Sequence, residues 1–394
     1  MKRVLLETGQ FSSGHWPAYP VTLAAGYGLW PDGLLGGRLL QAVYGLTPVA
    51  VALFVGRAAF GPRAGLIAGG LCAGLPLLLI YNDYLLTETL YAAVLSAAFA
   101  AAQVGMRRLN ASRGIGWGVL LGVLFGAAAL TRGTLGAALL PVMLVYIVWR
   151  YKARAVVYAV AALVALVVTI SPWLIYNAQT YGWATLSTRT GRDLYAGNNP
   201  WADGSWGSGV AYLDDPASPL YGLTPIEQAQ RGTQEAVAWI VRNPVPFAGK
   251  GVQAVRYLYE LPRQYAYSYR EGYYGQSPIA RLGWLMPTAV IGVSFAAVMV
   301  LFVIGSVAHR AKPAVQLCAV LLLAITGSAF LTYGDNRFLV PFVPLICVPA
   351  AAVIAHPRKT FALIGPRARA VTALLIVLLC VNWAVLAIAE LSAT

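Results

Sequence analysis

Long apolar blocks, separated by short charged or turn-rich breaks, run through most of this sequence. One of them, 155–170, contains no charged or amide side chain. A helix needs roughly 20 apolar residues to cross a bilayer core, and it satisfies its own backbone polar groups there. The pattern predicts an all-α polytopic membrane protein with about ten transmembrane helices. The expected spans lie near 36–55, 63–80, 85–105, 115–131, 134–149, 155–176, 283–306, 314–332, 338–355 and 370–389.

The apolar stretch 115–149 is too long for one of these spans. As a single helix it would measure about 52 Å at 1.5 Å per residue, well beyond a bilayer core. The polar residues Thr131-Arg132-Gly133-Thr134 interrupt it near the middle. We therefore expect a tight turn at this point, between two separate spans.

Composition and charge agree with a membrane protein and fix an expected orientation. Hydrophobic residues make up 59% of the 394 residues and charged residues 11%, whereas soluble proteins carry about 25% charged residues. Alternate loops contain 14 of the 28 basic residues and none of the acidic ones. Short loops rich in Lys and Arg stay in the cytoplasm. The net charge of +14 thus reflects membrane topology rather than nucleic-acid binding, and we expect a multi-pass protein of the inner (plasma) membrane.

This orientation places residues 1–30 outside the membrane. The start Met1-Lys2-Arg3 is followed by only three apolar residues before Glu7, too few for the h-region of a signal peptide. We therefore expect a helix upstream of this sequence, which would give eleven or more spans in a full-length form. The four cysteines lie in apolar blocks without a CxxC pair, which favours packing over disulfide or zinc chemistry.

Residues 177–280 interrupt the apolar pattern and are expected to form an α-rich external (periplasmic) loop domain between membrane regions 1–176 and 281–394. Thr224-Pro225-Ile226-Glu227 predicts a capping box that starts a helix ending near Arg242. A second helix is expected over 245–260, and a turn at Gly197-Asn198-Asn199-Pro200. The tyrosine-rich run 257–274 is typical of an aromatic belt at the membrane interface.

Two acidic residues at the outer membrane edge are candidates for chemistry, because charges there are costly and often functional. Asp83 and Glu88 bracket a short external turn. Together they could hold a divalent cation, or one could accept a proton from a nucleophile. The spacing fits equally well with carboxylates that stabilise the start of a helix. The sequence names no certain cofactor and leaves a divalent cation open.

Three arginines, Arg38, Arg132 and Arg337, sit singly at outer helix ends, where basic residues are disfavoured. Arginine binds phosphate through a planar fork of donors. The three indicate a site for a substrate with a phosphate at headgroup level and a tail in the lipid. The alternative for each is snorkelling or an ion pair, such as Arg337 with Asp335.

Glycine pairs with GxxxG spacing predict close helix packing and say nothing about a substrate. They are Gly65/Gly69, Gly70/Gly74, Gly118/Gly122 and Gly122/Gly126. The three histidines, His15, His309 and His356, are isolated in the sequence, so no metal cluster is expected from them.

Short motifs follow one another in a fixed order along nearly the whole chain: 5–11 (LLETGQF), Tyr19-Pro20, 25–40 ending in Arg38-Leu39-Leu40, 86–90 (LTETL), 129–134 (ALTRGT), Pro172-Trp173, 197–200 (GNNP) and 335–341 (DNRFLVP). In this order they resemble the GT-C membrane glycosyltransferases, in the branch similar to protein O-mannosyltransferases and aminoarabinose transferases. Each motif is short, and their order and spacing carry the resemblance.

The resemblance implies transfer of a sugar from a polyprenyl-phosphate donor to a protein, lipid or glycan acceptor on the external face, by an inverting displacement. It implies a catalytic aspartate in a first external loop, which would precede Leu5 and is absent from this sequence. It also gives Glu88 the acidic position of the second external loop, and places Arg337 where phosphate contact is expected. The alternatives are a secondary transporter or lipid flippase, and an inactive or truncated transferase homologue.

Overall fold

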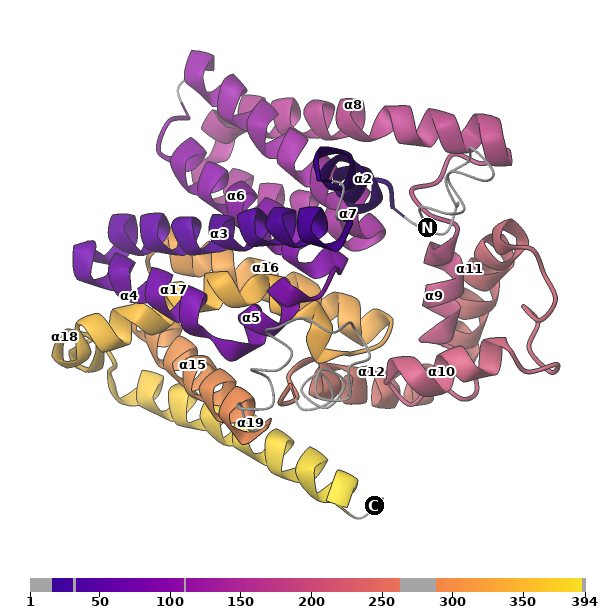
Figure 1. Ribbon diagram of the computed structural model, residues 1–394. Coiled ribbons are helices and arrows are strands. Elements are labelled where there is room, and N and C mark those ends of the chain that lie inside the picture. Colours follow the sequence, from indigo (N-terminus) through magenta and orange to yellow (C-terminus); the bar gives the residue numbers. More distant parts are fainter. Residues whose placement is uncertain (1–15, 31–32, 110, 263–287, 392–394) are drawn as a thin grey trace. The chain divides into compact units, whose positions relative to one another are not determined.

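The computed structural model describes residues 16–30, 33–109, 111–262 and 288–391, and all the regular elements in these ranges are helices. Most of these segments are apolar and suit an environment without water. Their backbone N–H and C=O groups must then bond to one another, and a helix satisfies them within the segment. The chain divides into two compact units, which are described in turn. Figure 1 labels their helices. Residues 263–287 lie outside the described ranges, and with them most of the tyrosine-rich run.

Unit 1 comprises residues 1–28, 109–258 and 323–338. Its helices are α2 (Ala18–Leu29), α7 (Ala111–Tyr151), α8 (Val156–Tyr181), α9 (Arg189–Ala196), α10 (Trp206–Leu213), α11 (Pro225–Arg242) and α12 (Pro244–Leu258), with the short 3₁₀ turns η1 (Lys152–Ala155) and η2 (Asn336–Phe338). Unit 2 comprises residues 29–108, 259–322 and 339–394. It holds α3 (Gly33–Phe60), α4 (Pro62–Gly74), α5 (Pro76–Asp83), α6 (Thr87–Met106), α15 (Thr288–Ala308), η3 (Val340–Phe342), α17 (Val343–Ala355), α18 (Pro357–Ala362) and α19 (Pro366–Leu391), while α16 (Pro313–Leu331) belongs to both units.

The apolar helices confirm a multi-pass membrane architecture. Among the described residues, eight helical stretches are long and apolar enough to cross a membrane, or nine if the bent pair α4–α5 counts as one span. One of the eight, Ala138–Tyr181, has 44 residues and would be about 66 Å long if it were straight. It instead contains the turn η1, across which α8 returns along α7. This stretch therefore holds two of the predicted spans.

The predicted interruption at Arg132 is confirmed. Arg132 (φ −142°, ψ 46°) and Gly133 (φ 42°, ψ −124°) leave the helical region of the backbone within α7. Glycine is required at 133 for two reasons. Its φ is positive, and a Cβ atom built there would lie 2.0 Å from Nε1 of Trp16.

A second break, between α4 and α5, was not predicted. Leu75 adopts an extended conformation before Pro76, and the two helices are bent by 52°. The proline ring disfavours helical geometry in the preceding residue, so the expected span 63–80 is divided. The helix α2 was not predicted either, and its 12 residues are too few to span a bilayer.

Glycines bring several helices into close contact, as the GxxxG pairs predict. A Cβ atom at Gly118 would lie 2.4 Å from the carbonyl oxygen of Tyr158 on α8, and one at Gly122 would lie 2.1 Å from that of Ala162. Gly65 packs equally closely against α3. Gly70 and Gly74 make no such contact within the described part of the chain, because a Cβ atom at either position would meet nothing there within 4 Å.

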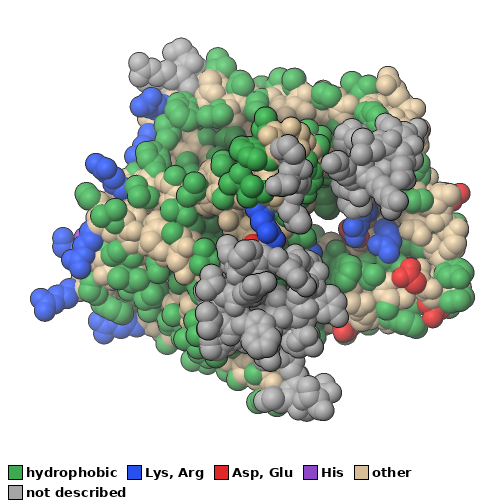
Figure 2. Space-filling model, viewed as in Figure 1, with side chains coloured by type: hydrophobic (Ala, Val, Ile, Leu, Met, Phe, Trp, Pro, Cys, Tyr) green, Lys and Arg blue, Asp and Glu red, His purple; other side chains and the backbone are tan. Residues whose placement is uncertain are grey.

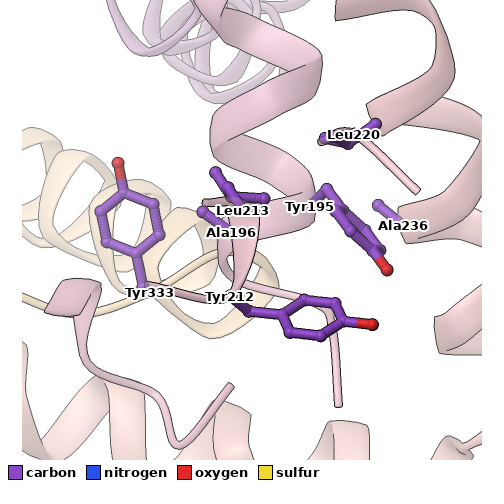
Figure 3. Packing of buried hydrophobic residues seen from close by; sticks show 7 residues of the cluster. All are labelled: Tyr195, Ala196, Tyr212, Leu213, Leu220, Ala236 and Tyr333. Atoms are coloured by element: carbon purple, nitrogen blue, oxygen red, sulfur yellow. The ribbon is translucent and has the colours of Figure 1, made fainter. Parts of the chain in front are cut away.

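The helices α9, α10 and α11 enclose a small apolar core in unit 1 (Figure 3). It consists of Tyr195, Ala196, Tyr212, Leu213, Leu220, Ala236 and Tyr333. The predicted capping box at the start of α11 is confirmed, since the Thr224 side chain accepts from the Glu227 N–H and the Glu227 carboxylate accepts from the Thr224 N–H. The turn expected at Gly197-Asn198-Asn199-Pro200 directly follows α9.

Apolar side chains cover long parts of the molecular surface (Figure 2). Only 17% of the apolar stretch of α19 is buried inside the protein. The helix α8 likewise exposes a row of valine side chains. Such surfaces suit contact with lipid rather than water. Lys and Arg side chains gather over the end of unit 2 that α4 and α18 form, and the chain has Arg57, Arg63, Arg358 and Lys359 near these helix ends.

Candidate functional site

A cavity of about 550 Å³ in unit 1 combines an apolar interior with a few polar groups, and we call it the Arg132 cavity. Arg132 reaches it from the break in α7, and Asp193 from α9. Trp16 and Tyr333 supply further polar groups. Its walls are mostly apolar and include Leu139, Val142, Leu194, Ile325, Leu331 and Phe338.

The break in α7 positions the Arg132 side chain. Its guanidinium carbon lies 5.3 Å from the centre of the Phe338 ring, in cation–π geometry, and the side chain is half-buried. The Phe338 ring in turn packs against Tyr333, with ring centroids 5.6 Å apart. The guanidinium therefore lies at the border of the cavity, and its planar fork of donors is of the kind that binds a phosphate or carboxylate.

Asp193 is the acidic group of the cavity. Its Oδ1 lies 3.8 Å from Nη2 of Arg189 and 4.0 Å from Nη1 of Arg192, and Oδ1 accepts no hydrogen bond from the described residues. Burial raises the pKa of this carboxyl group, while the two guanidinium groups oppose that shift. A partly buried carboxylate with unused acceptor capacity suits proton transfer or binding of a sugar hydroxyl.

Two aromatic residues complete the polar lining. The indole Nε1 of Trp16 is buried and has no hydrogen-bond partner among the described residues, so it is available to donate to a ligand oxygen. Burial and the nearby Asp193 carboxylate raise the pKa of the Tyr333 phenol, which therefore stays neutral and able to donate.

A separate cavity of about 280 Å³ in unit 2 contains the predicted residue Glu88, and we call it the Glu88 cavity. Glu88 is fully buried in the first turn of α6, and Thr87 Oγ1 donates to its Oε2 at 3.3 Å. Asn82 and Thr89 also line the cavity. Full burial makes a carboxylate expensive unless hydrogen bonds or a partner compensate, and the catalytic role of Glu88 stays a prediction.

Hydrogen bonds between α3, α5 and α6 hold the polar wall of the Glu88 cavity. Gln41 Nε2 donates to the Tyr84 carbonyl and to Thr89 Oγ1, and Thr89 Oγ1 donates to the Tyr81 carbonyl at 2.8 Å. The Oδ1 atom of Asn82 is buried without a hydrogen-bond partner among the described residues. Asp83 is half-buried at the end of α5.

The other predicted residues have varied surroundings. Arg38 is half-buried on α3, and its Nε is buried without a hydrogen-bond partner among the described residues. Arg337 lies in η2, where its backbone N–H donates to Oδ1 of Asp335 at 2.8 Å. Their roles in phosphate binding stay predictions.

Asn198 and Asn199 are completely buried and hold the chain after α9 in place. Nδ2 of Asn198 donates to the carbonyls of Leu194 and Leu331, and Nδ2 of Asn199 to those of Tyr195 and Gly209, all at 2.8–2.9 Å. These donors tie the loop to the neighbouring backbone, while Oδ1 of Asn198 is buried without a hydrogen-bond partner among the described residues. The place of both asparagines in the site stays a prediction.

The structure brings one predicted residue, Arg132, together with three that sequence reasoning missed: Trp16, Asp193 and Tyr333. The one signal for Asp193 was its position beside two arginines in a short segment after an apolar span. Among the described residues, no group of three or more His, Cys, Asp or Glu side chains could hold a metal ion, and a cation held by Asp83 and Glu88 stays a prediction.

Part of this sequence is similar to a known protein family. Residues 14–176, less than half of the chain, match the model of the family dolichyl-phosphate-mannose-protein mannosyltransferase. The resemblance predicted from the motifs is confirmed. The matched segment includes Glu88 and Arg132. No curated protein matches the chain.

Two solved structures are similar to this chain over most of its length. The crystal structure of ArnT from Cupriavidus metallidurans in the apo state has 17% sequence identity and a TM-score of 0.41, over 89% of this chain and 71% of that one. The structure of the same protein bound to undecaprenyl phosphate has 16% identity and a TM-score of 0.38, over 88% and 71%.

Proposed function

We propose that this chain transfers a sugar from a polyprenyl-phosphate donor to an acceptor on the external face of the inner (plasma) membrane. The observation that carries the proposal is the Arg132 cavity, where a guanidinium borders an apolar hollow of about 550 Å³. A polyprenyl phosphate has the matching chemistry, since its phosphate suits the guanidinium and its isoprenyl chain suits the apolar walls. The family match over residues 14–176 supports the same donor class.

In this proposal Arg132 binds the donor phosphate and stabilises the charge that develops on it. The acceptor oxygen forms a bond to the anomeric carbon, and the bond from that carbon to the phosphate oxygen breaks. The electron pair leaves with the polyprenyl phosphate, whose negative charge the fixed guanidinium offsets. A single displacement of this kind inverts the anomeric configuration.

A carboxylate must accept the proton that the acceptor hydroxyl loses. Asp193 faces the Arg132 cavity, and its two neighbouring arginines favour the ionised form that accepts a proton. Glu88, which the sequence predicts for an acid–base role with Asp83, lines the other cavity. We propose Asp193 as the proton acceptor for a donor bound at Arg132.

The proposal also assigns a side of the membrane to the loop domain, from the distribution of basic residues. It can be tested with single cysteines at Gln230 and Ala311, which are both exposed. An impermeant thiol reagent applied to intact cells should label Gln230→Cys and spare Ala311→Cys. The reverse labelling would overturn the orientation.

The donor assignment can be tested by binding of a polyprenyl phosphate to the purified chain in nanodiscs. Arg132→Ala should weaken binding by roughly 10- to 100-fold, since a hydrogen bond to a charged group contributes about 1.5–3 kcal/mol. Arg132→Lys keeps the charge but loses the fork, so its affinity should lie between wild type and Arg132→Ala.

The matched control is Arg231→Ala, which removes an arginine of unit 1 that pairs with Glu235 at 3.3 Å and does not line the cavity. The control should bind as wild type does. Equal affinities for wild type and both Arg132 variants would refute the phosphate assignment. A defect as large in Arg231→Ala would show that overall charge, and not the cavity, controls binding.

A further inference from the structure

A third cavity, of about 450 Å³, lies within unit 2 among α15, α16 and α19, and we call it the Arg310–Arg367 pocket. Its polar lining includes Arg310, Arg367 and Gln316. Val307, Val315 and Val371 contribute apolar side chains. The predicted donor and catalytic residues line other cavities or other parts of the fold, so this pocket has no role in the proposed transfer.

The charges around this pocket favour an anion. Arg310 and Arg367 are both exposed at it, and none of its lining residues is acidic. Two long helices also begin here, α16 at Pro313 and α19 at Pro366. Helix N-termini carry partial positive charge, which adds to that of the two guanidinium groups.

A buried hydroxyl supplies a further donor. Oγ of Ser306 lines the pocket, is buried, and makes no hydrogen bond with any of the described residues. Leaving a buried polar group without a partner destabilises the fold. An oxygen atom of a bound ligand would satisfy this hydroxyl, whereas a purely apolar occupant would not.

The apolar lining indicates that the ligand also has a hydrocarbon part. Val371 is 49% exposed and belongs to α19, whose long apolar surface is largely uncovered by the rest of the protein. A free phosphate or nucleotide would leave these side chains in contact with water. A phospholipid places its headgroup between the arginines and its acyl chains along the apolar helix surface.

We propose that the Arg310–Arg367 pocket binds an anionic phospholipid, with the lipid phosphate between the two arginines and an acyl chain against Val315 and Val371. The site lies at loops that are rich in basic residues and lack acidic ones, which the sequence predicts to face the cytoplasm. Anionic lipids are concentrated in that leaflet. The bound lipid would hold the start of α19 against α15 and α16.

The test uses the purified full chain in nanodiscs of phosphatidylcholine, to which phosphatidylglycerol is added. Bound phosphatidylglycerol is counted by native mass spectrometry after release into detergent. One basic residue near an anionic lipid contributes about a fivefold change in affinity, so Arg310→Gln and Arg367→Gln together should weaken binding roughly 30-fold.

The matched control, Arg57→Gln with Arg63→Gln, removes the same charge from two exposed arginines that do not line the pocket. It should retain lipid binding. The proposal is overturned if the pocket variant binds phosphatidylglycerol as wild type does, or if the control loses as much affinity, because binding would then depend only on net charge.

Two further arms separate a lipid from a free anion. Ala319→Phe fills the apolar part of the pocket and should abolish lipid retention while the arginines remain. Inorganic phosphate added to the wild-type chain should not displace phosphatidylglycerol. Displacement by phosphate, or full lipid retention in Ala319→Phe, would refute the lipid assignment.

Discussion

Replacing Gly122 by alanine should destabilise the contact between α7 and α8. The added Cβ atom would lie 2.1 Å from the Ala162 carbonyl oxygen and 2.7 Å from the Ala165 Cβ atom. The first distance is about 1.3 Å short of the 3.4 Å at which ordinary contact begins. Because the oxygen belongs to the backbone of α8, it cannot rotate away, and the two helices must separate locally.

The expected net loss is about 1–3 kcal/mol in the free energy of unfolding. Overpacking of a well-packed interface typically costs that much. If the helices separate by about 0.5–1 Å, each pair of contacting atoms between them also loses roughly a quarter to a half of its dispersion energy. The higher helix propensity of alanine, about 1 kcal/mol over glycine, offsets part of this cost.

The assay is unfolding by SDS titration in mixed micelles, followed by tryptophan fluorescence. Gly70→Ala is the matched control, because it is the same substitution in an apolar helix where the new atom meets nothing within 4 Å. The control should be neutral or more stable by about 0.5–1 kcal/mol. If Gly122→Ala is as stable as the control, the close approach of α7 and α8 is wrong.

Three further outcomes are expected. Glu88→Gln leaves the Arg132 cavity unchanged, so it should alter sugar transfer less than about threefold, and a loss of roughly 10²–10⁴-fold in a transfer assay would move the proton acceptor from Asp193 to Glu88. Because burial raises the pKa of Asp193, activity should fall on acidification at a higher pH than an exposed aspartate would give. Arg189→Gln removes a cation that lowers this pKa, so it should move the acid limb of the pH–activity profile to still higher pH. An unmoved limb would exclude Asp193 as the group that titrates. Thr224→Ala should lower the free energy of unfolding by about 0.5–2 kcal/mol through loss of the helix cap, and unchanged SDS unfolding would contradict this.

Features that depend on neighbouring residues followed from the sequence itself. The apolar blocks predicted the helices because span length and backbone hydrogen bonding are local requirements. The break at Arg132 followed from the excessive length of one block, and the capping box at Thr224 from a four-residue pattern. The order of short motifs predicted the family that the match over residues 14–176 supports.

Features that depend on which distant segments meet were decided by the tertiary structure. GxxxG spacing did not distinguish Gly122, which faces another helix, from Gly70, which faces none. The Arg132 cavity joins Trp16, Arg132, Asp193 and residues near 330, which no sequence window contains. Full burial of Glu88 likewise results from packing around α6. A side chain's type and local position suggest its chemistry, but its burial, pKa and partners depend on contacts that only the folded chain makes.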